Sequence, residues 1–466
     1  MERQIWHDSA SRNGIPFYNR FMIYERMPRG IRNHFRPCAA SEATLHRKGS
    51  ILNASMTRQD MEWVLTLFGT AIGAGILFLP IQAGLGGIWP MIILTLIILP
   101  LTYISHRGVT RMVASSEQAT DITGVVENDL GRNWGFAISV LYFLSIVTIC
   151  VGYATGVTNI VSSFLENQMG IDGISRPMLT GILLVGLTGV IVAGENTVLK
   201  VTSILVYPLI AILFGLSLYM IPYWNLSVFQ QPIEPASLVR NLLLTFPVLV
   251  FSMNFSPICS ALASSYRGKS ATPDEAVKRT DRVVWWNSLI LLVFVMFFVF
   301  SIVLSQTPQS MIDAKANNVD VLTMISLQSN EPWLRYLIPI VALIAIVTSY
   351  FGHFIGTREG LDGMIYRLAT WNADKDSKAA FNHRKLRTWT TISMIAGLWM
   401  LAVFNPPILK IIGAMSAPVI ALYCYVMPVV LMKRVPRLMI YRSTWGGVVF
   451  VFGLITIIGY GVAEYM

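Results

Sequence analysis

A series of long apolar segments, separated by short polar ones, decides what this chain can fold into. A helix needs roughly 17–25 apolar residues to cross a bilayer, and a backbone in lipid must satisfy its hydrogen bonds internally. About eleven segments meet that requirement. The sequence therefore predicts an all-α integral membrane protein with about eleven spans. The spans begin near Trp63, Gly87, Gly135, Pro177, Val201, Leu238, Val284, Trp333, Thr388, Ile408 and Gly446.

The composition excludes a soluble protein. Of the 466 residues, 54% are apolar and only 13% are charged, about half the usual share for a soluble domain. The four cysteines stand far apart with no CxxC pair, so neither a disulfide framework nor a metal site beyond a simple cation is predicted. No cofactor is expected. The bilayer is the expected partner, and nucleic acid is not, because the basic residues gather in loops on one side of the spans.

The positions of Lys and Arg predict the orientation. When the loops are assigned alternately to two sides, most of the 35 basic residues share the side of the N-terminus. They include Arg107, Arg111 and the cluster between residues 358 and 387. Basic loops stay in the cytoplasm. We therefore expect a cytoplasmic N-terminus and, with an odd number of spans, a C-terminus on the opposite side.

Residues 1–55 differ from the rest, because they are polar and basic and lack the apolar core of a secretory signal. We expect a disordered cytoplasmic tail, followed by a membrane domain over residues 56–466. Two alternatives stay open. The segment could be an organelle transit peptide, or translation could start at Met56.

The first span contains three glycines within seven residues, namely Gly69, Gly73 and Gly75. Each destabilises a helix by about 1 kcal/mol relative to Ala. The pattern favours an unwound hinge in mid-membrane. Free N–H groups at the start of its second half would then bind an anion. The alternative is a packing face, since Gly69 and Gly73 form a GxxxG pair.

The sixth span is also interrupted. Pro257 cannot donate a backbone hydrogen bond, and Ser252, Asn254 and Ser256 are polar residues within an otherwise apolar segment. A second broken span, five helices after the first, points to a transporter built from inverted repeats with its site at the midplane. Spans one to five would pair with spans six to ten, and the eleventh would be additional. The alternative is a kinked helix whose polar groups bind neighbouring helices.

The eighth and third spans add candidate site residues. Thr348 and Ser349 are adjacent hydroxyls suited to Na⁺, unless they only bond to carbonyls of their own helix. His353 could relay protons or be a histidine satisfied by its surroundings. Tyr153 could cap a small substrate, or simply pack. The sequence shows no nucleotide-binding or hydrolase motif, so we expect neither an ATP-driven pump nor an enzyme.

Several segments resemble the hydroxy/aromatic amino-acid permease family, and most closely its bacterial serine and threonine permeases. They are Gly69–Pro80, Phe251–Ile258, Gly352-His353 and Phe404-Asn405-Pro406. The likeness runs from about Thr57 to the end of the chain. It implies the leucine-transporter-like fold, a 5+5 inverted repeat plus one extra helix. It also implies uptake of a small hydroxy amino acid with a cation across the bacterial inner membrane.

These observations combine into a predicted substrate site for serine or a close relative. The carboxylate would bind N–H groups at the start of the second half of span one, and the ammonium would meet carbonyls of span six. Polar side chains of spans three and six would contact the short substrate side chain. The predicted substrate site comprises Gly73, Ala74, Gly75, Tyr153, Ser252, Met253 and Asn254.

A co-transported H⁺ or Na⁺ would bind nearby. The predicted coupling residues are Gly69, Ile72, Thr348, Ser349 and His353. The serine permeases have a lysine where this chain has Thr348, so the resemblance leaves the coupling ion open. An exchanger, an exporter or a membrane nutrient sensor on the same fold remains an alternative.

Overall fold

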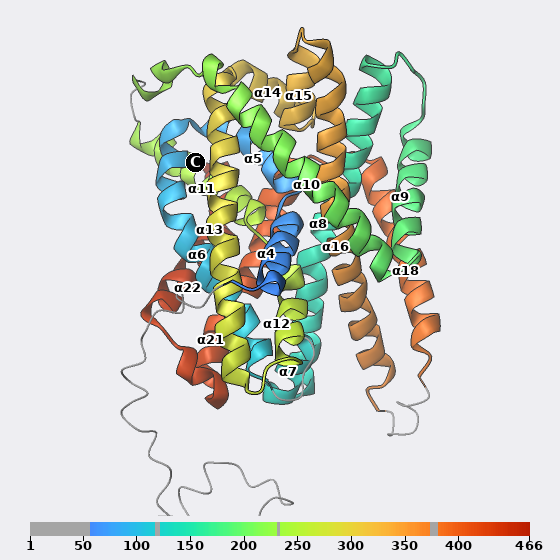
Figure 1. The fold of residues 1–466 in the computed structure, drawn as a ribbon, viewed down its shortest axis with the longest axis vertical. Helices are drawn as coiled ribbons and strands as arrows, with labels where there is room; N and C mark the ends of the chain where they lie inside the picture. The colour runs from blue at the N-terminus through green and yellow to red at the C-terminus, as the bar shows by residue number, and fades with distance from the viewer. Residues whose placement is uncertain (1–55, 117–121, 231–233, 373–380) are drawn as a thin grey trace, which may run out of the picture. The chain divides into compact units, whose positions relative to one another are not determined.

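A computed structural model describes residues 56–116, 122–230, 234–372 and 381–466. The predicted tail, residues 1–55, lies outside the described residues. In the part described, nine helices are long and apolar enough to cross a membrane, and the bent pair Arg58–Ala71 and Ala74–Gly86 can make a tenth span. The helix Arg176–Val192 is apolar but shorter. The predicted all-α membrane architecture is confirmed (Figure 1), with nine or ten such helices where about eleven spans were predicted.

The first repeat contains five spans. Its first span is the bent pair, in which two helices meet at 55°. The helices of this repeat are α4 (Arg58–Ala71), α5 (Ala74–Gly86), α6 (Ile88–Ala114), α8 (Arg132–Asn167), α9 (Arg176–Val192) and α10 (Glu195–Tyr219).

The second repeat begins with the other interrupted span. Its helices are α11 (Pro235–Ser252), the 3₁₀ turn η5 (Ser256–Ile258), α12 (Cys259–Arg267), α13 (Pro273–Ser305), α16 (Pro332–Ala369) and α18 (His383–Val403), followed by a composite tenth span. The eleventh span is α22 (Thr444–Tyr465).

The tenth span is irregular. It alternates α-helical and π-helical turns, and it contains Pro418 and Pro428. A proline cannot donate to the helix ladder, so the backbone around it rearranges. The segments are α19 (Ile408–Lys410), η6 (Ile411–Ser416), α20 (Ala417–Ile420), η7 (Ala421–Val426) and α21 (Met427–Arg434).

Short helices cap the bundle. The segment α7 (Ile122–Leu130) is fixed by two ion pairs, Arg367 to Glu127 at 2.8 Å and Arg437 to Asp129 at 2.5 Å. Two helices between spans seven and eight, α14 and α15, are absent from the sequence prediction because they are too short to stand out in hydropathy. The short helices besides α7 are α14 (Pro308–Ala316), α15 (Val321–Gln328), η3 (Ile221–Tyr223), η4 (Leu226–Gln230) and η8 (Pro436–Tyr441).

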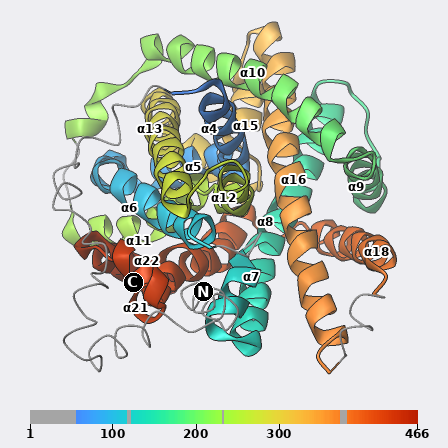
Figure 2. The ribbon, with the colours of Figure 1, turned by 60° about the horizontal axis from the view of Figure 1, so that its bottom comes forward.

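The broken first span lies inside the bundle. Helix α5 carries no charged residue and is buried along most of its length, as expected of a helix that is apolar on all sides. It packs on α11, α13 and α14, while α8 packs along α16. Figure 2 shows α5 surrounded by other spans, with α9, α10 and α18 toward the outside. Any ligand bound at the break is therefore enclosed by protein.

A network of amides joins several spans at the end opposite the basic loops. Arg176 donates to Asn159 Oδ1 at 2.7 Å and to Asn405 Oδ1 at 3.1 Å. Asn318 donates to the same Asn405 oxygen at 2.9 Å. Asn318 and Asn405 both have a positive φ, a conformation that Asn tolerates better than most residues. The network fixes the loops that follow spans three and nine.

Candidate functional site

The first span unwinds at Ile72 and Gly73. Ile72 is extended, with φ −77° and ψ 101°, and α5 starts again after Gly73. The N–H groups in the first turn of an α-helix have no partner within that helix. In α5, no side chain caps them either. The predicted interruption is confirmed. It leaves carbonyls at the end of α4 and N–H groups at the start of α5 without partners in their own helices.

Close approach explains the glycines at this break. A Cβ atom on Gly73 would lie 2.5 Å from Ser349 Oγ and 2.8 Å from the Tyr153 hydroxyl oxygen. A Cβ atom on Gly75 would lie 2.6 Å from the Ser252 Cα atom. The start of α5 thus touches spans three, six and eight at once. The structure brings these five predicted site residues together.

The sixth span unwinds over Met253, Asn254 and Phe255 before the turn that contains Pro257. The Ser252 hydroxyl donates to the Val248 carbonyl of its own helix at 2.7 Å. Asn254 Oδ1 accepts from the Ser256 N–H at 3.2 Å. This second predicted interruption is also confirmed. Of its polar side chains, Ser252 bonds within its own helix and Asn254 bonds within the unwound segment.

Sequence reasoning missed the residue that holds this second break, His106 on α6. The Phe255 N–H donates to His106 Nε2 at 3.1 Å, and the two rings stack with centroids 3.9 Å apart. Because Nε2 accepts, the ring proton belongs on Nδ1, which lies 2.9 Å from the Thr102 carbonyl oxygen. The sequence offered a histidine inside an apolar span and the resemblance of His106-Arg107-Gly108 to the permease family, and neither signal linked His106 to span six.

Ser349 and Thr348 behave differently although they are neighbours. Ser349 Oγ donates to the Ile72 carbonyl at 2.6 Å, and the carbonyl oxygens of Thr70 and Gly69 lie 3.3 and 3.5 Å from it. The Thr348 hydroxyl donates instead to the Ile344 carbonyl of its own helix at 2.9 Å. The structure therefore brings Ser349 to the unwound carbonyls, while the Thr348 hydroxyl bonds within α16.

His353 lies one turn beyond this cluster. Its Nδ1 atom is 2.8 Å from the Ser349 carbonyl oxygen, and its ring meets the Tyr153 ring edge to face at 5.1 Å. It is fully enclosed among spans. His353 thus connects the residue that contacts the carbonyls, Ser349, with the tyrosine beside Gly73.

On the basic side, a buried polar cluster ties both broken spans together. Asp60 at the start of α4 is fully buried, accepts from the Tyr266 hydroxyl of α12, and lies 2.6 Å from Arg282 Nη2 of α13. A buried carboxylate needs such partners. The cluster thus joins the start of α4 to α12 and α13.

Two interrupted helices that meet at the centre of two five-helix repeats define a membrane transporter of the leucine-transporter fold. Solved structures share this fold. MhsT in complex with L-phenylalanine matches with a TM-score of 0.57 at 13% identity, covering 88% of this chain and 98% of that one. A manganese transporter of Eremococcus coleocola matches with a TM-score of 0.56 at 14% identity, covering 87% and 85%.

Sequence comparison gives the family. Residues 56–463 match the tryptophan/tyrosine permease family, and the chain belongs to it. The chain is 38% identical over 408 residues to the serine transporter SdaC of Escherichia coli (strain K12), covering 86% of this chain and 94% of that protein. The serine transporter SdaC of Shigella flexneri is 37% identical over the same shares. The protein is therefore a multi-pass amino-acid transporter and not an enzyme, as the sequence predicted.

Proposed function

We propose that this protein carries serine, or a similar small hydroxy amino acid, into the cytoplasm together with Na⁺ or H⁺. The observation that carries the proposal is the contact between the two breaks, where Gly75 of span one meets Ser252 of span six. The similarity to the serine transporters of Escherichia coli and Shigella flexneri supports the substrate class.

The two breaks offer opposite partial charges to a zwitterion. The start of α5, at Gly73, Ala74 and Gly75, presents N–H groups and the positive end of a helix dipole. The end of α11, at Ser252 and Met253, presents carbonyls and the negative end of another. We place the substrate carboxylate at the first and its ammonium group at the second.

The surroundings favour a small side chain on the substrate. Tyr153 and Ser349 approach Gly73 so closely that a single added carbon would contact both. Asn254 lies within the unwound part of span six, and we propose that its amide also contacts the substrate. A hydroxymethyl group can bond to such polar groups.

For the cation we propose a site made of neutral oxygens. Ser349 Oγ and the carbonyls of Gly69, Thr70 and Ile72 are hard ligands of the kind that unwound transporter helices offer to Na⁺. The hydroxyl of the neighbouring Thr348, also a predicted coupling residue, donates instead to the Ile344 carbonyl of its own helix. If the ion is H⁺, His353 is the titratable group in contact with Ser349.

Coupling to a cation supplies the driving force, because a zwitterion carries no net charge. One charge moving through about 100 mV contributes about 2.3 kcal/mol. At about 1.4 kcal/mol per factor of ten, that corresponds to roughly a 45-fold accumulation of substrate. The concentration gradient of the ion adds to this value.

We assign the basic face to the cytoplasm, with residues 1–55 as a tail on that side and the C-terminus on the other, in a bacterial inner membrane. A cavity of about 80 Å³ lies between α8, α12 and α16, lined in part by Tyr142, Pro257 and Gly360. It lies on the basic side of the second break. We propose it as part of the release route.

The test is uptake of radiolabelled L-serine into proteoliposomes, with Na⁺ and H⁺ gradients imposed separately. We expect accumulation under one gradient, and weaker accumulation in Ser349→Ala at cation concentrations that do not saturate the unmodified protein. Serine counterflow without net accumulation under either gradient would contradict symport. A lack of both uptake and counterflow, with transport of another amino acid in a competition screen, would contradict the substrate.

A further inference from the structure

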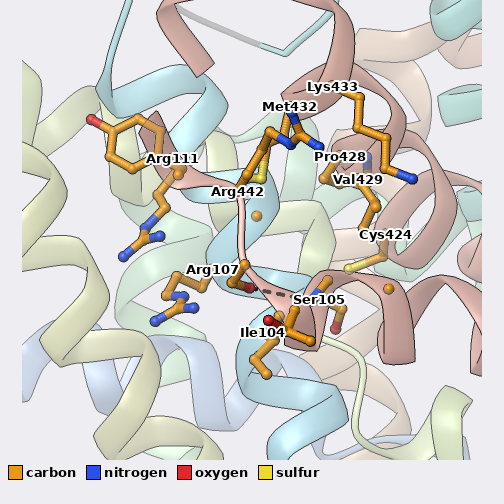
Figure 3. Close-up of a pocket in the computed structure, with 16 residues that line it drawn as sticks. Ile104, Ser105, Arg107, Arg111, Cys424, Pro428, Val429, Met432, Lys433 and Arg442 are labelled. Atoms are coloured by element: carbon orange, nitrogen blue, oxygen red, sulfur yellow. Dashed lines mark hydrogen bonds between the residues drawn. The ribbon is translucent and has the colours of Figure 1, made fainter. Parts of the chain in front are cut away.

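A second cavity opens away from the substrate site, between α6, α21, η8 and the start of α22 (Figure 3). Its volume is about 180 Å³. One wall belongs to α6, and the facing wall belongs to the C-terminal segment of the chain. Its apolar lining includes Ile104, Pro428, Val429 and Met432.

Four basic residues surround this cavity, namely Arg107, Arg111, Lys433 and Arg442. Arg111 is neutralised by Asp281, whose Oδ1 atom lies 3.0 Å from its Nε atom. In the described part of the chain, no carboxylate pairs with Arg107, Lys433 or Arg442.

Of the three basic residues without a carboxylate partner, Arg107 lies over an aromatic ring, and Lys433 and Arg442 are exposed to solvent. Arg107 lies over the Tyr103 ring at 4.7 Å and donates to its hydroxyl at 3.2 Å. Lys433 and Arg442 are exposed. Their charges can therefore reach a ligand without breaking an ion pair.

The first turn of α22 lies at the same wall. The Ser443 hydroxyl caps this helix by accepting from the Gly446 N–H at 3.2 Å. Gly446 and Gly447 both line the cavity and have no side chains to block approach to the backbone. The start of a helix favours an anion, and here it coincides with uncompensated basic side chains.

From these features we infer that the cavity binds the headgroup of an anionic phospholipid. The cavity lies at the ends of membrane spans, on the face where the basic loops gather, which is where such headgroups are found. Its charged rim matches a phosphate, while Ile104, Val429 and Met432 offer an apolar surface to the adjoining acyl chains. A free phosphate would leave that apolar surface uncovered. The inference does not depend on the transported substrate.

The test uses the purified full chain in a neutral detergent and measures its thermal midpoint with added phosphatidylglycerol or phosphatidylcholine. The variant Lys433→Gln with Arg442→Gln removes two exposed cations from the cavity. The matched control, Arg384→Gln with Lys385→Gln, removes the same two residue types from the exposed first turn of α18. We expect phosphatidylglycerol alone to raise the midpoint, and this rise to fall by half or more in the cavity variant but not in the control.

Equal rises in the cavity variant and the control would overturn the inference, as would an equal rise with phosphatidylcholine. A third arm adds glycerol phosphate, which carries the headgroup charge without acyl chains. We expect no rise, and a rise equal to that with phosphatidylglycerol would assign the cavity to a free phosphate instead. If the double variant fails to fold, native mass spectrometry of the unmodified protein provides the readout. Preferential retention of phosphatidylglycerol over phosphatidylcholine, reduced in Arg442→Gln, supports the site, and equal retention refutes it.

Discussion

Both broken spans leave backbone groups without hydrogen bonds in their own helices, but these groups find different partners in the two spans. At Ile72 and Gly73 the chain turns sharply, and a side chain from another span, Ser349, donates to the carbonyls where α4 ends. At the second break the freed N–H groups of Phe255 and Ser256 are bound by His106 and by the Asn254 side chain. We propose that the polar groups of the first break are the ones that a ligand and a cation bind. The second is held by the protein.

This difference suggests a division of roles. A break whose groups are bonded by a single hydroxyl can exchange that bond for a ligand at little cost. A break fixed by a stacked histidine is a preorganised wall, because a buried N–H left without a partner costs about 1–3 kcal/mol. We expect substitutions at the first break to affect transport most, and substitutions at the second to affect stability.

The largest effect is expected where the two breaks touch. Gly75→Ala places a carbon 2.6 Å from the Ser252 backbone, which must then shift. We expect uptake to fall by more than about tenfold, consistent with overpacking costs of about 1–3 kcal/mol. Gly152→Ala is the control, since its added carbon meets no atom within 4 Å. Normal uptake by Gly75→Ala would show that the breaks do not form the site.

The next prediction separates Ser349 from Thr348. Ser349→Ala removes the hydroxyl that contacts the α4 carbonyls, and we expect the half-saturating cation concentration to rise about tenfold, as for loss of one bond to a charged group. Thr348→Val removes a hydroxyl that bonds within its own helix, so we expect a change of less than about twofold. Cation titration of uptake measures both. Equal losses would mean that both hydroxyls bind the ion.

A third prediction concerns the second break. His106→Phe keeps a ring against Phe255 but leaves its N–H without an acceptor. We expect a lower thermal midpoint, corresponding to about 1–3 kcal/mol, with uptake reduced only in proportion to the folded fraction. His106→Gln restores an acceptor and should recover part of the loss. Unchanged stability in His106→Phe would contradict the role of this histidine.

The smallest effect is expected at Tyr153. Tyr153→Phe removes the hydroxyl beside Gly73 while keeping the ring against His353. We expect KM for serine to rise about two- to tenfold, the range for losing one ordinary hydrogen bond. Tyr336→Phe, at an exposed position, is the control. A change in the cation dependence rather than in KM would place Tyr153 with the ion instead of the substrate.

Much of the fold follows from local sequence. The all-α membrane architecture and both interruptions were predictable, because hydropathy sets which segments enter a bilayer and because Gly and Pro weaken a helix wherever it is packed. The same reasoning identified Gly73, Gly75, Tyr153, Ser252 and Ser349 as candidates, and these residues lie together. Their function stays a prediction until transport is measured.

Other features depended on how the helices are turned against one another. Successive residues of a helix point about 100° apart, so Thr348 and Ser349, alike in sequence, meet different surroundings. His106 reaches Phe255 only because α6 packs beside the second break, a contact between residues 149 positions apart. By itself, the sequence determined which segments cross the membrane and where they break. Only the tertiary structure decided which side chains face those breaks, because helix rotation and packing are set by long-range contacts.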